Sequence, residues 1–178
     1  MNWALVVACL ALVFTVASFW WLQARRGSLE VGQPGAYTFA TRVRLKLPLA
    51  IYNAGARALV VTDLLVLVDD GDVRLPWIAT TDRLYGDEGR DFQTAFAVPG
   101  RSTYELNAEF GHDDGWSPEP GLKHRMRLLA RLHDRGDKWH DVAEFDWWAP
   151  PPGAKTGAYI AYRNAPPDQQ YGRNIADA

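Results

Sequence analysis

The sequence predicts an all-β domain, an immunoglobulin-like β-sandwich of about 7–8 antiparallel strands, behind one N-terminal transmembrane helix. Three observations predict this arrangement. Residues 3–22 form an unbroken run without a charged side chain. Between residues 27 and 150, apolar and polar side chains alternate in short stretches, which is typical of strands with one buried face. Gly, Pro, Asn and Asp separate these stretches, as turns between strands require.

Composition limits the classes of function. The chain has 178 residues, of which 48% are hydrophobic and 22% charged, and these values are ordinary for one folded domain with an extra segment. The net charge of −2 gives no indication of a nucleic-acid partner. The single cysteine, Cys9, lies in the apolar run. The remainder therefore has no disulfide, thiolate nucleophile or cysteine zinc ligand.

The apolar run has the length of a membrane-spanning helix, because 20 residues at 1.5 Å each cover about 30 Å. Trp3 lies at one end of the run, and Trp20 and Trp21 lie at the other, where indole rings favour the membrane boundary. Arg25 and Arg26 end the span. A cleaved signal peptide is the alternative, but the run is long for one and no basic residue precedes it.

Basic residues on one side of the span predict its orientation. Arg25, Arg26, Arg42 and Arg44 follow the helix, whereas no Lys or Arg precedes it. The positive-inside rule places such a flank in the cytoplasm. We therefore expect a single-pass protein of the cell membrane with a cytoplasmic domain, and an extracytoplasmic domain is the alternative.

Small side chains recur on one face of the predicted helix. Their spacing alternates between four and three residues, which keeps them in one stripe: Ala4, Ala8, Ala11, Thr15 and Ser18. Such a stripe lets two helices approach closely in lipid. It predicts a transmembrane partner or a homo-oligomer, although membrane helices are rich in small residues in any case.

The chain divides into three predicted parts. Residues 1–26 form the transmembrane anchor and its basic flank, residues 27–150 form the β-sandwich, and residues 151–178 form a Pro-rich, mostly disordered tail. The tail has too few apolar residues to build a core of its own.

Alternation and turn residues delimit the strands. They are expected over residues 44–52, 58–68, 74–79, 92–98, 104–110, 124–134 and from residue 139 onward. Asn53-Ala54-Gly55 is expected to turn because Asn and Gly tolerate positive φ, and Pro99-Gly100 fits the centre of a type II turn.

The last hairpin has a predicted register. Pairing Asp134 with Trp139 places Met126 opposite Trp147, and it also places His133 opposite His140. This register joins apolar residues on one face and opposite charges on the other.

Residues 49–61, with Asn53 and Gly55 in the turn, resemble the strand–Asn-x-Gly–strand hairpin of many bacterial immunoglobulin-like sandwiches. The layout is also similar to uncharacterised bacterial single-pass membrane proteins in which a helix and an Arg pair precede such a domain. The resemblance implies a fold and no activity, so no functional residues are carried over.

The histidines give the one constellation with potential for metal chemistry. His133 and His140 would supply two ligands from the outer face of the hairpin, while His124 points to the opposite face and His112 lies in a loop. A zinc site needs three or four converging ligands, so no metal or other cofactor is predicted. A metal-dependent hydrolase that uses this His/Asp cluster remains the alternative from another class.

The hairpin also predicts a surface for a partner. Trp148 is expected outside the core beside Arg125, where the guanidinium group would stack on the indole or both side chains would contact another protein. No motif for nucleophilic catalysis or phosphate binding occurs in the sequence. We therefore expect a non-enzymatic, membrane-anchored module with a structural or protein-interaction role, or an extracytoplasmic binding or adhesion domain.

Overall fold

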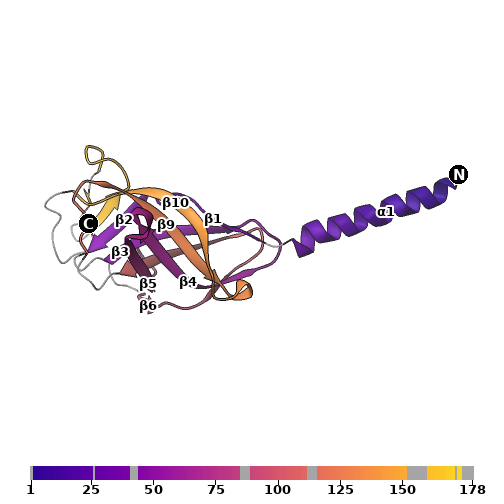
Figure 1. Cartoon of the computed structure of the whole chain (residues 1–178), viewed down its shortest axis with the longest axis horizontal. Coiled ribbons are helices and arrows are strands. Elements are labelled where there is room, and N and C mark those ends of the chain that lie inside the picture. The colour runs from indigo at the N-terminus through magenta and orange to yellow at the C-terminus, as the bar shows by residue number, and fades with distance from the viewer. Residues whose placement is uncertain are drawn as a thin grey trace.

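An apolar helix projects from one end of a β-rich domain in the computed structural model of the chain (Figure 1). The structure describes residues 2–25, 27–40, 44–84, 89–111, 116–151, 160–170 and 172–173.

Helix α1 (Trp3–Phe19) continues into a wider π-helical turn, η1 (Trp20–Ala24). The stretch from Trp3 to Gln23 is long and apolar enough to cross a membrane, and none of it is buried inside the protein. The Arg25 N–H closes the wider turn by donating to the Trp20 carbonyl at 3.0 Å. A side-chain surface that is apolar all round and is not buried against the domain suits a lipid environment.

The strands follow the helix along the chain, with two short 3₁₀ turns between them. They are β1 (Leu29–Val31), β2 (Ala36–Ala40), β3 (Arg44–Asn53), β4 (Leu59–Val68), η2 (Asp69–Gly71), β5 (Val73–Thr81), β6 (Asp91–Phe92), β7 (Phe96–Val98), β8 (Thr103–Gly111), β9 (Lys123–Leu132), η3 (His133–Arg135), β10 (Trp139–Trp148), β11 (Ile160–Arg163) and β12 (Gly172–Arg173).

Hydrogen bonds connect these strands into one curled sheet with the order β10-β9-β4-β5-β8-β3-β2-β11-β12. In addition, β1 pairs with β3, β6 pairs with β5, and β7 pairs with β4. Every pairing among the described residues is antiparallel. The prediction of an antiparallel all-β domain behind one N-terminal helix is therefore confirmed. A sandwich of the immunoglobulin type stays a prediction, because the strands are hydrogen-bonded as one sheet.

Strand β5 makes the bend that curls the sheet. Its first residues, Val73–Pro76, pair with β4, and its later residues, Trp77–Thr81, pair with β8. The change of partner coincides with an irregularity between Trp77 and Ala79, and such bulges increase local twist. Trp77 lies inside the bend with 1% of its surface exposed.

The core follows from the alternation that predicted the strands. In β3 the four aliphatic side chains at alternate positions are buried, and three of the β8 side chains that face them are also buried: Leu45, Leu47, Leu49, Ile51, Leu106, Ala108 and Phe110. Three large aromatic residues, Tyr37, Trp77 and Trp147, fill the space between the curled halves. Burial of this apolar area is the main term that stabilises the domain.

The side chain of Asn164 closes the gap between β10 and the segment before β2. Its Oδ1 accepts the Trp148 N–H at 3.0 Å, and its Nδ2 donates to the Asp146 and Pro34 carbonyls at 2.8 and 3.1 Å. Next to it the Tyr37 hydroxyl donates to the Trp148 carbonyl at 2.6 Å. Burial raises the pKa of Tyr37 far above its usual range, so this hydroxyl keeps its proton.

Part of the predicted tail belongs to the domain. Strand β11 pairs with β2, and Ile160 and Tyr162 point into the core with 8% and 4% of their surface exposed. The packed region thus extends past the expected boundary at Pro150, because two inward side chains and Asn164 supply contacts that a compositional argument does not reveal. Residues 152–159, 171 and 174–178 of the expected tail lie outside the described residues.

The predicted register of the last hairpin is wrong, by three residues at its start, where Trp139 lies opposite Arg131, and by two residues beyond a bulge. Met126 lies opposite Phe145 instead of Trp147, and the connection holds the 3₁₀ turn η3, which lengthens it. A bulge between Asp141 and Ala143 then restores the inward direction of Phe145 and Trp147. Trp147 is fully buried as expected, although it faces His124.

The β3–β4 turn at Asn53 and the β7–β8 turn at Gly100 both form, but without the positive φ angles expected at these two residues. Gly100 does not adopt a positive φ, while the next residue, Arg101, does, at 54°. Glycine is needed at position 100 for close approach, since a Cβ there would lie 2.0 Å from the Ala56 carbonyl oxygen. Asn53 is fully buried and acts through its side chain rather than through a positive φ.

Asn53 joins the β3–β4 turn to the neighbouring strand. Its Oδ1 accepts the Gly55 N–H at 3.0 Å, and its Nδ2 donates to the carbonyls of Arg57 at 2.8 Å and Val98 at 3.1 Å. The Arg101 N–H donates to the Asn53 carbonyl at 2.9 Å. One side chain and its own backbone therefore bind the β3–β4 and β7–β8 turns together.

The same two turns hold the end of the helix. The Ala56 N–H donates to the Arg25 carbonyl at 3.1 Å, and the Arg101 guanidinium donates to the Trp21 carbonyl at 2.6 Å. The Arg25 guanidinium lies over the Trp21 ring, 4.6 Å from its centroid. The helix therefore leaves the domain through a hydrogen-bonded junction.

Candidate functional site: a groove beside a buried ion-pair network

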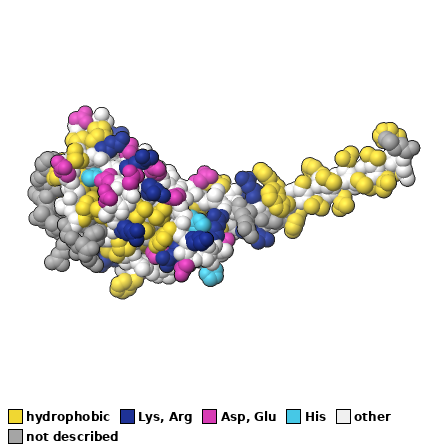
Figure 2. All heavy atoms as spheres, in the orientation of Figure 1, with side chains coloured by type: hydrophobic (Ala, Val, Ile, Leu, Met, Phe, Trp, Pro, Cys, Tyr) yellow, Lys and Arg dark blue, Asp and Glu magenta, His cyan; other side chains and the backbone are white. Residues whose placement is uncertain are grey.

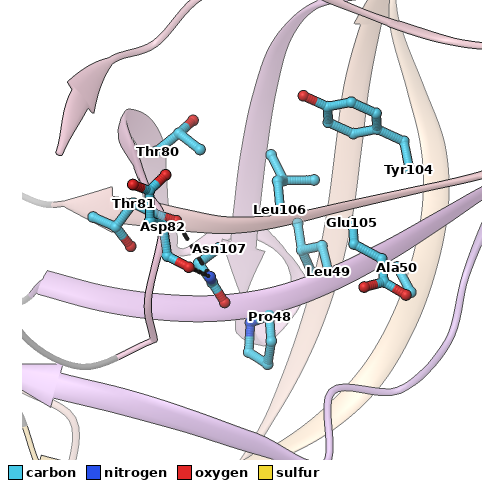
Figure 3. Close-up of a pocket in the computed structure, with 10 residues that line it drawn as sticks. All are labelled: Pro48, Leu49, Ala50, Thr80, Thr81, Asp82, Tyr104, Glu105, Leu106 and Asn107. Atoms are coloured by element: carbon cyan, nitrogen blue, oxygen red, sulfur yellow. Dashed lines mark hydrogen bonds between the residues drawn. The ribbon is translucent and has the colours of Figure 1, made fainter. Parts of the chain in front are cut away.

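A groove of about 470 Å³ lies on the side of the domain where β5 leaves β8. Three segments line it: residues 48–50 of β3, residues 80–82 at the end of β5, and residues 104–107 of β8. In Figure 3, Asp82 and Asn107 lie toward one end of the groove, and Ala50 and Glu105 lie toward the other.

The groove exists because one edge of β8 is only partly paired. Strand β3 pairs with β8 from Arg44–Gly111 to Tyr52–Thr103, whereas β5 pairs with it only as far as Asn107. In the described part of the chain, no strand is hydrogen-bonded to residues 103–106 on the β5 side. A short free strand edge is therefore open beside the groove, and such edges accept additional strands.

The rim of the groove is ordered by side-chain contacts. Asn107 donates from Nδ2 to the carbonyls of Thr81 and Asp82 at 3.2 and 3.1 Å, which holds the end of β5 in place. At the other end Tyr104 stacks on Phe96, with ring centroids 4.7 Å apart and ring planes at 13°. The open edge therefore lies between two fixed borders.

Apolar and acidic side chains characterise the groove. Pro48 and Ala50 give it an apolar floor, and the carboxylates of Asp82 and Glu105 are exposed at its rim. Its lining holds no histidine, cysteine or serine. The two carboxylates favour a ligand with positive charge.

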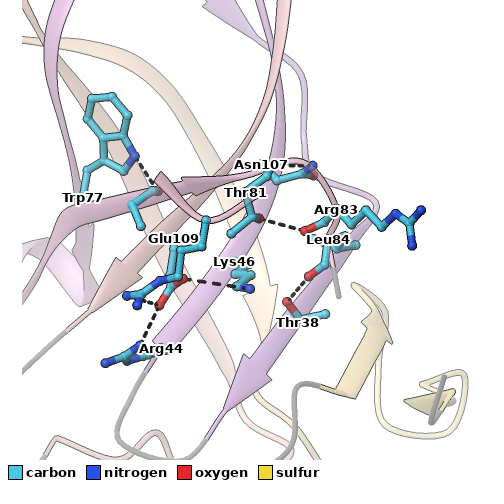
Figure 4. A network of polar contacts seen from close by, with 11 residues as sticks. Thr38, Arg44, Lys46, Trp77, Thr81, Arg83, Leu84, Asn107 and Glu109 are labelled. Carbon is cyan, nitrogen blue, oxygen red and sulfur yellow. Dashed lines mark hydrogen bonds and ion pairs between the residues drawn. The ribbon is translucent and has the colours of Figure 1, made fainter. Parts of the chain in front are cut away.

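A buried ion-pair network lies on the same face, close to the groove. Glu109 is fully buried, and its carboxylate lies 3.3 Å from the Arg44 Nη1, 3.2 Å from the Arg90 Nε and 3.9 Å from the Lys46 Nζ (Figure 4). Lys46 is also fully buried and lies opposite Glu109 in the β3–β8 register. Charged groups tolerate such burial only when they are paired.

Two hydroxyl groups hold the segment that follows β5. Thr38, which is fully buried, donates to the Leu84 carbonyl at 2.8 Å, and Thr81 donates to the Arg83 carbonyl at 2.7 Å. Arg90, which precedes β6, forms an ion pair with Glu109. The network thus fixes the chain that borders the groove.

The three histidines that the structure describes do not converge. His140 lies opposite Ala130, so the expected cross-strand pair of His133 and His140 is wrong. His124 points inward as expected and its Nδ1 lies 2.6 Å from the Asp69 carboxylate. Within the described residues, no group of three or more His, Cys, Asp or Glu could hold a metal ion. His112 lies outside those residues.

The predicted partner surface at Trp148 has a different neighbour. Trp148 lies opposite Lys123, whereas Arg125 forms an ion pair with Glu144. An arginine does stack on an indole ring at the other end of this hairpin. There the Arg131 guanidinium group lies 4.6 Å from the centroid of the Trp139 ring. A role of Trp148 and Arg125 in partner binding stays a prediction.

The predicted membrane-boundary residues lie at the two ends of the helix. Trp3 is 69% exposed, and Trp20 and Trp21 are 55% and 54% exposed next to the junction. Arg25 follows them, while Arg26 and Arg42 lie outside the described residues. The last flanking residue, Arg44, begins β3 at the end of the domain away from the helix.

The small-residue stripe lies on α1, and none of α1 is buried against the domain. Its members Ala4, Ala8, Ala11 and Thr15 are exposed, and Ser18 is part-exposed. The Thr15 hydroxyl donates to the Ala11 carbonyl at 2.8 Å, which satisfies it within the helix. The stripe is therefore available to a second helix, and its use stays a prediction.

Sequence reasoning missed both the groove and the network. The alternation in β8 placed Glu105, Asn107 and Glu109 together on one face, which is the correct face. It did not distinguish the buried Glu109 from the exposed Glu105. The signal was Lys46, a charge within an apolar strand that needs a buried partner.

Comparison of this chain with known protein families and with curated proteins finds no match.

Replacement of Glu109 by Gln should destabilise the domain by about 3 kcal/mol, because it removes a buried carboxylate that faces a buried ammonium group. The matched replacement Glu105→Gln, on the same face of β8 but exposed, should change stability by less than about 0.5 kcal/mol. Urea unfolding of the full chain, followed by tryptophan fluorescence, measures both values. Equal effects of the two variants would contradict a structural role for the network.

Proposed function

We propose that this protein is a single-pass, membrane-anchored β-module with a structural or protein-interaction role. The observation that supports this proposal most directly is the junction. There a helix of membrane-spanning length and composition is hydrogen-bonded to two turns of a folded domain. A continuous junction of this kind holds the domain close to the lipid surface. The module presents a binding surface and does not catalyse a reaction.

The domain belongs in the cytoplasm under this proposal. Arg25 and Arg26 follow the span directly and no Lys or Arg precedes it, which supports this orientation by the positive-inside rule. Arg44 adds little support, because β3 carries it about 30 Å from the junction.

The partner binds in the groove as an extended segment that adds to the free edge of β8. Strand addition obtains affinity from backbone hydrogen bonds, and selectivity from side chains that fit alternate positions. The exposed carboxylates of Asp82 and Glu105 select a segment that carries Lys or Arg. The small-residue stripe of the helix provides a second contact, to a transmembrane partner or a second copy of this chain.

Membrane anchoring and orientation are tested together. The full chain should stay in the membrane pellet after washing with alkaline carbonate, and deletion of residues 2–24 should release it. A green fluorescent protein fused after Ala178 should fluoresce, and alkaline phosphatase at the same point should be inactive. An active phosphatase fusion would place the domain outside the cell, and a full chain released by carbonate would exclude the anchor.

Groove binding is tested by photo-crosslinking in cells. A benzophenone amino acid at Ala50, in the groove, should give a crosslinked partner band, whereas the same group at Val60, exposed on β4, should not. Reversal of charge in Asp82→Lys/Glu105→Lys should lower the Ala50 band about tenfold, because the basic segment is then repelled. A band of equal strength from both positions, or no effect of the charge reversal, would contradict the groove.

A further inference from the structure

Basic side chains from four separate segments meet at the end of the domain that carries the helix. Arg25 follows the helix, Arg57 lies in the β3–β4 turn, and Arg101 lies in the β7–β8 turn. Arg135 and Lys138 lie in the β9–β10 connection. All five are exposed or part-exposed, and we name them the basic collar. Figure 2 shows dark-blue side chains around the point where the apolar helix meets the domain.

The junction fixes the position of the collar relative to the span. Arg101 donates to the carbonyl of Trp21, which lies near the end of the apolar segment, and Arg25 stacks on the ring of the same residue. Arg135 donates to the carbonyl of Gly27, only a few residues later. These guanidinium groups therefore lie just beyond the apolar segment, at the level where lipid headgroups begin.

The charge of this end differs from that of the rest of the chain. The segments 25–30, 53–58, 99–102 and 133–138 hold six Lys or Arg against three Asp or Glu, a net charge of +3. The whole chain has a net charge of −2, so the remainder carries −5.

One connection at the opposite end of the strands is acidic, although Arg44, Arg74 and Lys123 also lie toward that end. The β4–β5 connection, at the far end of β4 from the junction, holds Asp69, Asp70 and Asp72 and no basic residue. The end from which the helix leaves therefore carries a net positive charge, whereas the remainder of the chain is net negative.

We propose that the basic collar docks onto the headgroups of anionic phospholipids around the helix. The inference rests on the proposed membrane anchoring, and it adds the lipid class and the face of the domain that contacts it. Each Lys or Arg near an anionic surface is attracted within a Debye length, about 8 Å at physiological ionic strength. Because turns anchored by Asn53 carry Arg57 and Arg101, docking holds the domain upright and keeps the groove beside β8 turned sideways, away from lipid.

The test measures the approach of the domain to lipid in the full chain. Cys9 is the only cysteine, so a Cys9→Ser/Asp134→Cys variant accepts one donor fluorophore, on the exposed β9–β10 connection. The labelled protein is reconstituted in nanodiscs that contain headgroup-labelled acceptor lipid. Energy transfer should be higher in discs with about 30% phosphatidylglycerol than in pure phosphatidylcholine, and about 0.5 M NaCl should remove the difference.

Two matched pairs of substitutions separate the collar from overall charge. Arg57→Gln/Lys138→Gln should lower the ratio of docked to undocked protein in anionic discs on the order of tenfold. Arg74→Gln/Lys123→Gln removes one Arg and one Lys from the opposite end and should leave the ratio unchanged. Equal transfer in both lipids, or equal effects of the two pairs, would overturn the proposal. Failure of the chain to enter either kind of disc would instead contradict the anchoring on which it rests.

Discussion

The carboxamide of Asn53 is the constraint on which the rest of the structure depends. It is fully buried, its Oδ1 binds the β3–β4 turn, and its Nδ2 binds both that turn and the distant Val98 carbonyl. A buried backbone carbonyl or N–H without a partner costs about 1–3 kcal/mol, so this one side chain stabilises several groups at once. The close packing of Gly100 against the Ala56 carbonyl depends on the same arrangement.

The turns that Asn53 joins also determine how the domain is placed relative to the helix. They hold Arg25 and Trp21, so the helix leaves the domain at a fixed place. The strands run from that place toward the acidic connection at the far end, and the groove lies along β8 between the two ends. Anchor, basic collar and groove are therefore parts of one arrangement, in which the span determines what faces lipid and what faces a partner.

Local sequence patterns correctly predicted those features of the fold that depend on residues close together in the sequence. The apolar run, the alternation in β3 and β8 and the turn at Asn53 all lie within short windows, and all three correspond to features of the structure. The features that the sequence did not predict depend on irregular turns or on contacts between residues far apart in the sequence. The register of the last hairpin depends on a 3₁₀ turn and a bulge, and neither has a residue pattern of its own. Asn164 bonds to a carbonyl 130 positions away, and the groove requires β5 to leave β8.

The most direct test of the central role of Asn53 is the replacement Asn53→Ala in the full chain. We predict a loss of about 3 kcal/mol in the free energy of unfolding, with faster hydrogen exchange in both turns, residues 54–58 and 99–102. The control Asn107→Ala removes two bonds at the rim of the groove and should cost about 1 kcal/mol without affecting those turns. A loss for Asn53→Ala no larger than for the control, or unchanged exchange in the two turns, would contradict that role.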